Sequence, residues 1–176
     1  MNPVTRKAVQ AASNANVWLY RRTNGQVGGR GMGRLPLLLL TVPGRNTGTP
    51  HTVPVACLDH DGGWIVVGTG MGGSKRTPQW FLNLRAAGKG HVQIGAREHD
   101  VTAHLPTSAE RDMLWPHIAA RAPHFGKWQA RTGRTLPIII LTARPHPAGR
   151  GHPAARAIGH QPSAPAAPDE LSRASR

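Results

Sequence analysis

The sequence has little of several features that would identify common protein classes. Cys57 is its only cysteine, which excludes a disulfide framework and, because no cysteine pair exists, argues against a structural zinc site. The longest strongly apolar run, at residues 35–43, is far shorter than the ~18 residues or more that a membrane-spanning helix needs. No signal peptide is recognisable at the N-terminus, so the expected location is the cytoplasm.

Acidic residues are also scarce, with 8 Asp and Glu in the whole chain. Those in its body form no pair that resembles the two carboxylates of a glycosidase. The G-x-S-x-G motif of serine hydrolases is absent. The ten histidines include no helical pair with an intervening glutamate, so no metal site is predicted. So little acid–base machinery favours an enzyme whose cofactor supplies the chemistry while the protein binds and orients it.

Basic residues, in contrast, are abundant. The 22 Lys and Arg give a formal net charge of +14, which implies anionic partners such as nucleic acid, anionic lipid or an acidic small molecule. They are scattered singly or in pairs, as on any solvated basic surface. A nucleic-acid-binding module would interleave aromatic platforms with them, and the predicted strands carry only Trp64. Nucleic-acid binding therefore rests on charge alone, and no specific nucleic-acid partner is expected.

Turn signals separate six short runs that are apolar or alternate in polarity, and these runs predict strands. Asp59–Gly63 predicts a hairpin turn, and residues 95–97 predict a second turn. The predicted strands cover residues 37–42, 52–58, 64–67, 91–94, 101–105 and 136–141.

The helices are predicted by composition and by capping signals. An N-terminal helix is expected over residues 3–22. Thr77 and Pro78 are expected to cap and open a helix that ends at Gly88. Thr107 and Glu110 match a capping box for the next helix. The helices are expected at residues 3–22, 79–87, 107–121 and 124–132, with a break at Pro123.

This order of elements predicts the fold class. Strands linked by hairpins argue against a doubly wound α/β sheet. They favour a mainly β, α+β fold, in which an antiparallel sheet or small barrel carries flanking helices. Three segments are expected. Residues 1–34 form the N-terminal helix and a flexible glycine-rich segment, residues 35–143 form the cofactor-binding domain, and residues 144–176 form a disordered tail rich in Pro, Ala and Gly.

Two glycine-containing loops, at residues 44–48 and 68–76, carry cationic side chains at Arg45, Lys75 and Arg76. Glycines let the backbone approach a ligand closely, and exposed N–H groups beside a cation favour an anion. The loops therefore predict a cradle for an anionic cofactor, although a loop without any ligand is an alternative.

The second loop also satisfies G-x-G-x-x-G at Gly68, Gly70 and Gly73, which makes a Rossmann dinucleotide site a competing interpretation. In that motif the helix begins at the glycines and holds the pyrophosphate at its N-terminus. Here residues 74–78 intervene, and the preceding strands are linked by hairpins. Both features argue against the Rossmann interpretation.

The segments LLLLTVPGRNTGTPHTVPV and WIVVGTGMGGSKRTPQWFLNLRA resemble the deazaflavin-dependent nitroreductase family, also described as F420H2-dependent quinone reductase-like oxidoreductases. WPHIAARAPHFGKWQARTGRTLPIIIL resembles that family's C-terminal part, so the resemblance covers residues 17–143. It implies a split β-barrel of about six antiparallel strands. It also implies coenzyme F420, a deazaflavin with a phosphodiester and an oligoglutamate tail.

The same resemblance implies roles for individual residues. Arg45, Asn46 and Thr47 would hold the phosphate or the tail, and residues 51–55 would run along the ring system. Thr69 is the catalytic candidate, because a hydroxyl there would bond the acceptor or relay a proton. The implied cofactor-binding residues are Arg45, Asn46, Thr47, His51, Thr52, Val53, Pro54, Val55, Val67, Gly68, Thr69, Gly70, Lys75, Arg76, Trp80, Phe81, Asn83 and Leu84, and the implied substrate pocket contains Phe125 and Trp128.

The implied reaction is hydride transfer from reduced F420 to an apolar acceptor such as a quinone or a nitroaromatic compound. Some relatives carry tyrosines over the acceptor pocket, where this chain has Ala122, Phe125 and Trp128, so the acceptor stays open. A lipid quinone would agree with an apolar pocket and with an N-terminal segment that contacts the inner face of the cell membrane. The alternative function is non-catalytic binding or storage of F420 or of a flavin such as FMN. Monomer and homodimer are both left open.

Overall fold

The computed structural model describes residues 3–31, 34–69 and 76–145, and of residues 3–12 the backbone alone. The chain divides into two units, Met1–His146 and Pro147–Arg176, and every described residue lies in the first unit. Residues 146–176, for which the sequence predicts a tail, lie outside the described residues. The predicted segment boundaries after residues 34 and 143 stay predictions.

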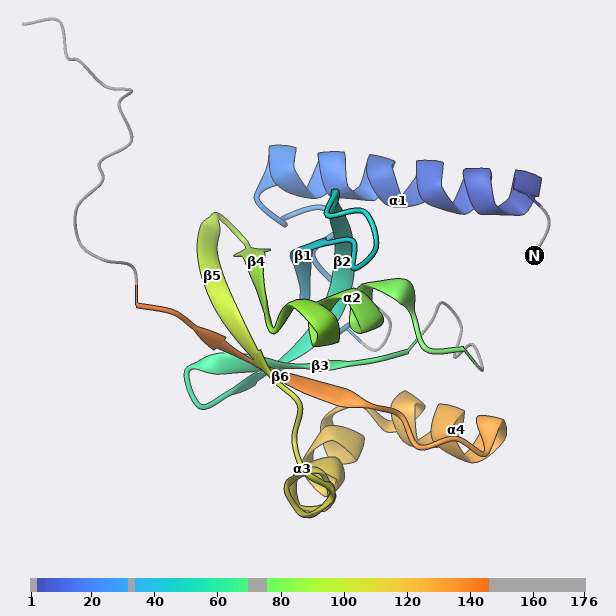
Figure 1. The fold of residues 1–176 in the computed structure, drawn as a ribbon, viewed down its shortest axis with the longest axis vertical. Coiled ribbons are helices and arrows are strands. Elements are labelled where there is room, and N and C mark those ends of the chain that lie inside the picture. The colour runs from blue at the N-terminus through green and yellow to red at the C-terminus, as the bar shows by residue number, and fades with distance from the viewer. Residues whose placement is uncertain (1–2, 32–33, 70–75, 146–176) are drawn as a thin grey trace, which may run out of the picture. The chain divides into compact units, whose positions relative to one another are not determined.

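Six antiparallel strands close into a barrel, which confirms the fold class predicted from the sequence (Figure 1). Around the barrel the order is β1-β2-β3-β6-β5-β4, and β1 pairs with β4 to close it. The strands are β1 (Leu37–Pro43), β2 (Pro50–His60), β3 (Gly63–Val67), β4 (Lys89–Ile94), β5 (Arg97–His104) and β6 (Ile138–Ala143).

Local sequence explains the hairpins that build this barrel. Asp61 and Gly62 join β2 to β3, and both have positive φ angles, 45° and 74°. Two residues with positive φ match the right-handed twist of the strands on either side. Gly95, with φ of 60°, opens the turn between β4 and β5. Both predicted turns are therefore confirmed.

Alternate residues of all six strands point into the barrel, as the two-residue period of a strand requires. The helix α2 (Gln79–Ala87) adds Phe81 and Leu84 to this interior cluster. The strand residues of the cluster are Leu38, Leu40, Val42, Val55, Cys57, Trp64, Val66, Val92, Val101, Ile139 and Leu141.

Residues of the opposite parity form two further clusters on the outer face of the barrel. The helices α3 (Ser108–Arg121) and α4 (Pro123–Thr132) cover a cluster that contains Ile65, Val67 and Ile138. The helix α1 (Pro3–Thr23) packs on Leu37 and Leu39. Figure 1 shows α1 on one side of the barrel and the pair α3 and α4 on the other.

The capping predictions have mixed outcomes. The Thr107–Glu110 capping box is present, and its backbone and side-chain hydrogen bonds hold the pKa of the Glu110 carboxyl below its usual value. Gly88 ends α2 in the left-handed conformation, as predicted. Thr77, however, does not cap α2. The N-cap is Pro78, whose side chain has no polar atom to cap the helix. The Thr77 hydroxyl accepts a hydrogen bond of 2.9 Å from Arg134.

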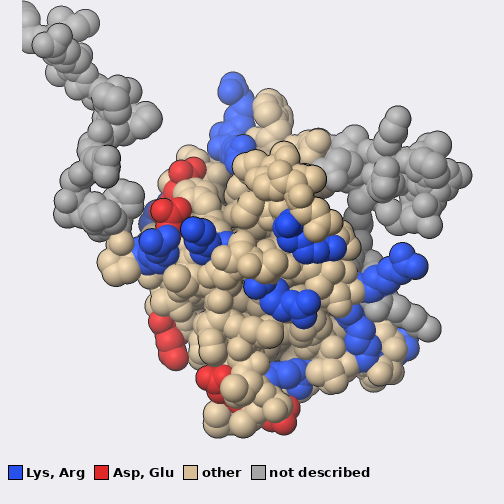
Figure 2. All heavy atoms as spheres, in the orientation of Figure 1, with Lys and Arg blue, Asp and Glu red and all other residues tan. Residues whose placement is uncertain are grey.

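Lys and Arg side chains are spread over the visible face of the molecule, while Asp and Glu occupy only a few places (Figure 2). Scattering of this kind agrees with the single and paired basic residues in the sequence. It means that net charge alone does not locate a site, and that a site must be found from a cavity and its lining.

Candidate functional site

A cavity of about 840 Å³ opens between α1, the loop from β1 to β2, the first residues of β2 and the first residues of α2. Its volume lies within the ~300–1,000 Å³ range of small-molecule sites. It brings together residues that the sequence predicted as cofactor-binding from three separate segments. The predicted residues that line it are Arg45, Asn46, Thr47, His51, Thr52, Val53, Trp80 and Asn83.

Arg45 is held in place by two amide side chains of α2. Its Nη1 donates to Asn83 Oδ1 at 3.0 Å and to Gln79 Oε1 at 2.9 Å, and its backbone N–H donates to Asn83 Oδ1 at 3.3 Å. Asn83 is only 7% exposed, so its carbonyl oxygen is a buried acceptor that satisfies both groups of Arg45. Neutral acceptors fix the guanidinium without cancelling its charge, which leaves that charge available to an anion.

The loop that carries Arg45 is a tight turn. The Gly48 N–H donates to Gly44 O at 2.7 Å, and Gly48 has a φ of 70°. A Cβ atom at Gly44 would lie 2.7 Å from Thr47 Oγ1, a distance that real side chains do not tolerate. The glycines therefore allow the loop to fold back compactly, with Arg45, Asn46 and Thr47 presented to the cavity.

The lining combines this cationic corner with apolar surface. Val53 from β2 and Trp80 from α2 both border the cavity, and both pack partly against the barrel interior. None of the described residues that line the cavity is acidic. The arrangement suits a ligand that has a flat or apolar part and a strongly anionic part.

The helix α1 forms a wall of the cavity that sequence reasoning missed. Asn14, Val17, Trp18 and Arg21 line it, and their spacing of three or four residues places them on one helix face. The sequence predicted the helix but not the surface on which it packs. Gln79 was also missed, because an exposed glutamine at the start of a helix carries no signal of its own.

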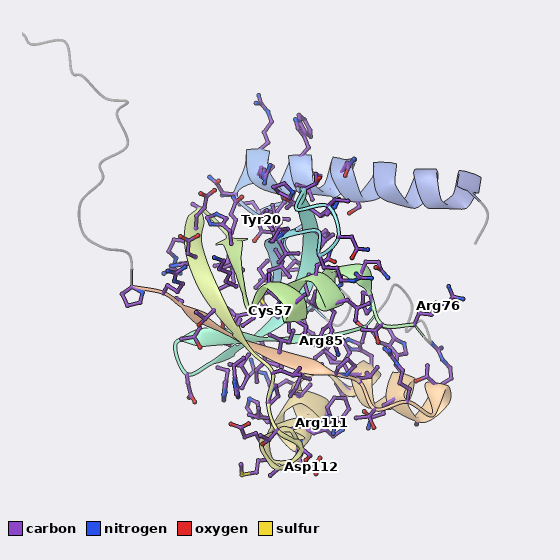
Figure 3. The ribbon with its side chains drawn as sticks, viewed as in Figure 1. Tyr20, Cys57, Arg76, Arg85, Arg111 and Asp112 are labelled. Atoms are coloured by element: carbon purple, nitrogen blue, oxygen red, sulfur yellow. The ribbon has the colours of Figure 1, made fainter. Side chains whose placement is uncertain are left out.

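Tyr20 fastens this wall to the barrel. It is 1% exposed, and Figure 3 shows it between α1 and the strands. Its hydroxyl donates to Leu37 O at 2.8 Å and accepts from the Gly95 N–H at 3.0 Å. Burial raises the pKa of Tyr20, so the hydroxyl keeps its proton at neutral pH and continues to donate.

Three predicted cofactor-binding residues have side chains inside the barrel instead of on the cavity wall. Val55, Phe81 and Leu84 belong to the interior cluster and are at most 5% exposed. Val53 and Val55 share one face of β2, and Val53, nearer the start of the strand, lines the cavity while Val55 lies in the core. On α2, Trp80 and Asn83 line the cavity, while Phe81 and Leu84 belong to the interior cluster. These three residues support the site from behind and do not line the cavity.

The predicted residues around the second glycine loop lie apart from the described cavity. Val67 packs in the cluster under α3 and α4, and the Thr69 N–H donates to Val67 O at 2.7 Å. Pro54, Gly68, Thr69 and exposed Arg76 (Figure 3) do not line the cavity. Gly70 and Lys75 lie outside the described residues, and the catalytic role of Thr69 stays a prediction.

Arg134 connects the two ends of that loop. Its Nη2 donates to Gly68 O at 3.1 Å and its Nη1 donates to Thr77 Oγ1 at 2.9 Å. Sequence reasoning missed this arginine, since no pattern indicates that a residue just before β6 contacts residues far earlier in the chain. Arg134, which lies between α4 and β6, therefore holds both ends of the loop through hydrogen bonds.

Phe125 and Trp128, the predicted acceptor-pocket residues, form an aromatic group with His124. The centroid of the His124 ring lies 4.3 Å from that of Phe125 and 5.0 Å from that of Trp128. Burial lowers the pKa of His124, which favours a neutral imidazole. Phe125 and Trp128 belong to the cluster between α4 and the barrel, together with Val67, and do not line the cavity. Their acceptor role stays a prediction.

A smaller cavity, of about 350 Å³, borders the turn between β2 and β3. Its lining contains Asp59 beside Arg97 and His99, and the His99 ring lies 5.5 Å from Trp64. Carboxylate and guanidinium together make its charge mixed. It contains none of the predicted site residues, so the larger cavity is the candidate site.

Comparison with known proteins places this chain among one group of enzymes. Residues 12–143 match the family described as F420H(2)-dependent quinone reductase. An F420H(2)-dependent quinone reductase of Mycobacterium tuberculosis is 33% identical over 129 residues, which are 72% of this chain and 86% of that protein. A putative F420H(2)-dependent quinone reductase of the same species is 34% identical over 110 residues, or 62% of this chain and 92% of that protein.

Solved structures agree with the barrel. A structure of an F420-H2 dependent reductase, FDR-A, covers 60% of this chain and 93% of its own, with a TM-score of 0.54 and 28% identity. A structure described as a domain-swapped dimer covers 80% of this chain and 99% of its own, with a TM-score of 0.57 and 24% identity. The second likeness concerns the fold alone.

The hydrogen bonds of Arg45 predict unequal roles for its two partners. We expect Asn83→Ala to lower the free energy of unfolding by about 1–3 kcal/mol, because a buried acceptor is lost and the Arg45 N–H is left without a partner. Gln79→Ala removes a similar bond at an exposed position, where water replaces it, so the expected loss is below about 0.5 kcal/mol. Urea denaturation followed by circular dichroism measures both. Equal effects of the two substitutions would contradict the prediction.

Proposed function

The chain belongs to the F420H(2)-dependent quinone reductase family, and on this premise we propose that it reduces a quinone with the reduced deazaflavin of coenzyme F420. The observation that carries the proposal is the cavity in which Arg45 is held by uncharged partners beside apolar surface. The alternatives, FMN as the cofactor and a non-catalytic binding protein, are not favoured, because the relatives are named as F420H(2)-dependent reductases.

The cavity residues fit this coenzyme chemically. A phosphodiester and an oligoglutamate tail are anionic, and the described lining offers Arg45 and Arg21 with no acidic residue. A deazaflavin ring is flat and largely apolar, and Val53 and Trp80 present apolar surface in the same cavity. When bound, the reduced deazaflavin supplies a hydride from its C5 position.

We assign the chain's own residues to binding and positioning. Arg45 takes the phosphodiester through guanidinium N–H groups other than those that bond Asn83 and Gln79. The turn at residues 44–48 places Asn46 and Thr47 beside the same anion. Val53 and Trp80 pack against the ring and exclude water, which strengthens the electrostatic contacts in the site and brings the acceptor close to C5. His51 and Thr52 border the ring on the β2 side.

Turnover of a quinone tests the function directly. Purified protein is mixed with reduced F420 and a water-soluble naphthoquinone, and the reappearance of oxidised F420 is followed by fluorescence. We expect oxidation that depends on both protein and quinone. When NADPH or reduced FMN replaces reduced F420, we expect the protein to add nothing to the rate of quinone reduction measured without it. Tight binding of F420 without turnover across a quinone panel would instead favour a binding or storage protein.

Arg45 provides the second test. We expect Arg45→Gln to weaken F420 binding by about 10- to 100-fold, the equivalent of about 1.5–3 kcal/mol for a hydrogen bond to a charged group. Arg85→Gln is the matched control, because Arg85 is an exposed arginine near the end of α2 that does not line the cavity. Fluorescence titration measures both affinities. The same loss in both variants would show that overall charge, and not the Arg45 site, holds the coenzyme.

The finer identity of the acceptor is a separate proposal. None of the helices within residues 3–31, 34–69 and 76–145 is both long and apolar enough to cross a bilayer. We propose that α1 makes a peripheral contact with an anionic membrane and that the acceptor is a lipid quinone. Trp18 is 64% exposed, and Arg21 and Arg22 lie in the last turn of α1. An exposed tryptophan near cationic side chains is typical of interfacial helices.

Vesicle flotation tests the membrane contact. We expect the intact protein to float with vesicles that contain phosphatidylglycerol, and Trp18→Ala to lower the bound fraction. Met113→Ala is the control, because Met113 on α3 is an apolar side chain that is at least as exposed, at 74%. If the protein stays in the dense fraction with anionic vesicles, the membrane proposal is overturned. The proposal that the protein is a reductase would still stand.

A further inference from the structure

The last residue of α1 that lines the cavity is the cationic Arg21. Asn14, Val17, Trp18 and Arg21 are spaced as one stripe along the helix, since residues three and four apart lie above one another. Val17, at 8% exposed, packs the stripe onto the barrel, while Arg21 is exposed at the cavity edge. Arg21 therefore presents a solvent-exposed guanidinium on the α1 wall of the cavity.

The position of Arg21 is fixed by its neighbour in sequence. Tyr20 is buried and is bonded through its hydroxyl to two backbone groups, Leu37 O and the Gly95 N–H. This contact holds the last turn of α1 against the barrel, so the Arg21 backbone cannot drift from the cavity. An arginine on an anchored helix loses less entropy on binding than one on a loose segment.

Arg21 and Arg45 face the same cavity from different walls, one from α1 and the other from the loop between β1 and β2. Within the described part of the chain, no hydrogen bond or ion pair engages the Arg21 side chain. The described lining holds no carboxylate that could neutralise either arginine. Two cations without an acidic partner around one cavity favour a ligand that carries more than one negative group.

We infer that Arg21 is a further cofactor-binding residue that takes the carboxylates of the oligoglutamate tail, while Arg45 takes the phosphodiester. The inference rests on the proposed function, because it assigns the tail of the coenzyme proposed there. The division of roles follows from how each side chain is held, since both arginines are exposed. The Arg45 guanidinium is bonded to Asn83 and Gln79 and suits the compact phosphodiester. The Arg21 guanidinium is not fixed in this way, so it suits a long and flexible tail.

Exposure also sets the size of the effect. Ion pairs at exposed positions are weak and are screened by salt. We therefore expect Arg21→Gln to weaken binding of F420 with several glutamates by only about three- to tenfold at low ionic strength. For the tail-less coenzyme, which ends before the first glutamate, we expect a change of less than about twofold, because Arg21 then has no glutamate carboxylate to bind.

The experiment compares three variants with two forms of oxidised F420. Arg21→Gln removes the charge at the cavity. Arg22→Gln is the matched control, because it removes the same charge from the adjacent position on α1, which does not line the cavity. Arg21→Lys keeps the charge but loses the bidentate geometry, so its affinity is expected between those of the wild-type protein and Arg21→Gln. Fluorescence titration at low and high salt gives each dissociation constant, and circular dichroism checks that every variant is folded.

The expected result is a loss of affinity that appears only in Arg21→Gln and Arg21→Lys, only with the long tail, and that shrinks at high salt. An equal loss in Arg21→Gln and Arg22→Gln, or an equal loss with both forms of the coenzyme, would overturn the inference. So would an altered KM for the quinone with an unchanged affinity for F420, since Arg21 would then serve the acceptor.

Failure of the inference is distinguishable from failure of the proposed function. A wild-type protein that binds neither form of F420 would remove the proposed function and this inference with it. A wild-type protein that binds F420 and reduces a quinone, with Arg21→Gln indistinguishable from Arg22→Gln, would remove this inference alone.

Discussion

The candidate site depends on the two contacts that α2 makes, one with the barrel interior and one with Arg45. One face of this short helix puts Phe81 and Leu84 into the barrel interior, and the other presents Asn83 to Arg45. Hydrophobic burial therefore fixes the helix, and the buried amide then fixes the cation. A loop between two strands would otherwise hold its arginine loosely. Because the amide is neutral, the loop is positioned without losing the charge that an anionic ligand requires.

Local chemistry made much of the fold predictable. The Asp61–Gly62 turn and the Thr107–Glu110 capping box involve neighbours in sequence, so residue types alone indicated them. The barrel followed from the hairpin order and from the family resemblance. Contacts between distant segments were not predictable in this way. The sequence does not show that Arg134 binds the Thr77 hydroxyl, or that α1 packs beside the loop of Arg45.

The site residues show the same difference between local features, which the sequence indicates, and packing, which it does not. The motif at residues 78–84 indicated a helix beside the ligand, but not which of its faces is buried in the barrel. The structure separates Trp80 and Asn83, on the cavity, from Phe81 and Leu84, in the core. Net charge was a still weaker guide, because the Lys and Arg side chains of the described residues are dispersed over the visible face (Figure 2). What locates an anion site is a cavity whose cations lack acidic neighbours, and that is a property of the folded chain.

Geometry also constrains where an acceptor can meet the coenzyme. Hydride transfer needs the reacting atoms within about 3–3.5 Å of each other, so the acceptor must lie against the ring itself. Phe125 is 2% exposed and packs between α4 and the outer face of the barrel, away from the wall formed by α1. Phe125 does not line the cavity beside Val53 and Trp80 in which the ring is proposed to bind. The cavity itself offers the indole of Trp18, which is on the wall that the sequence did not reveal.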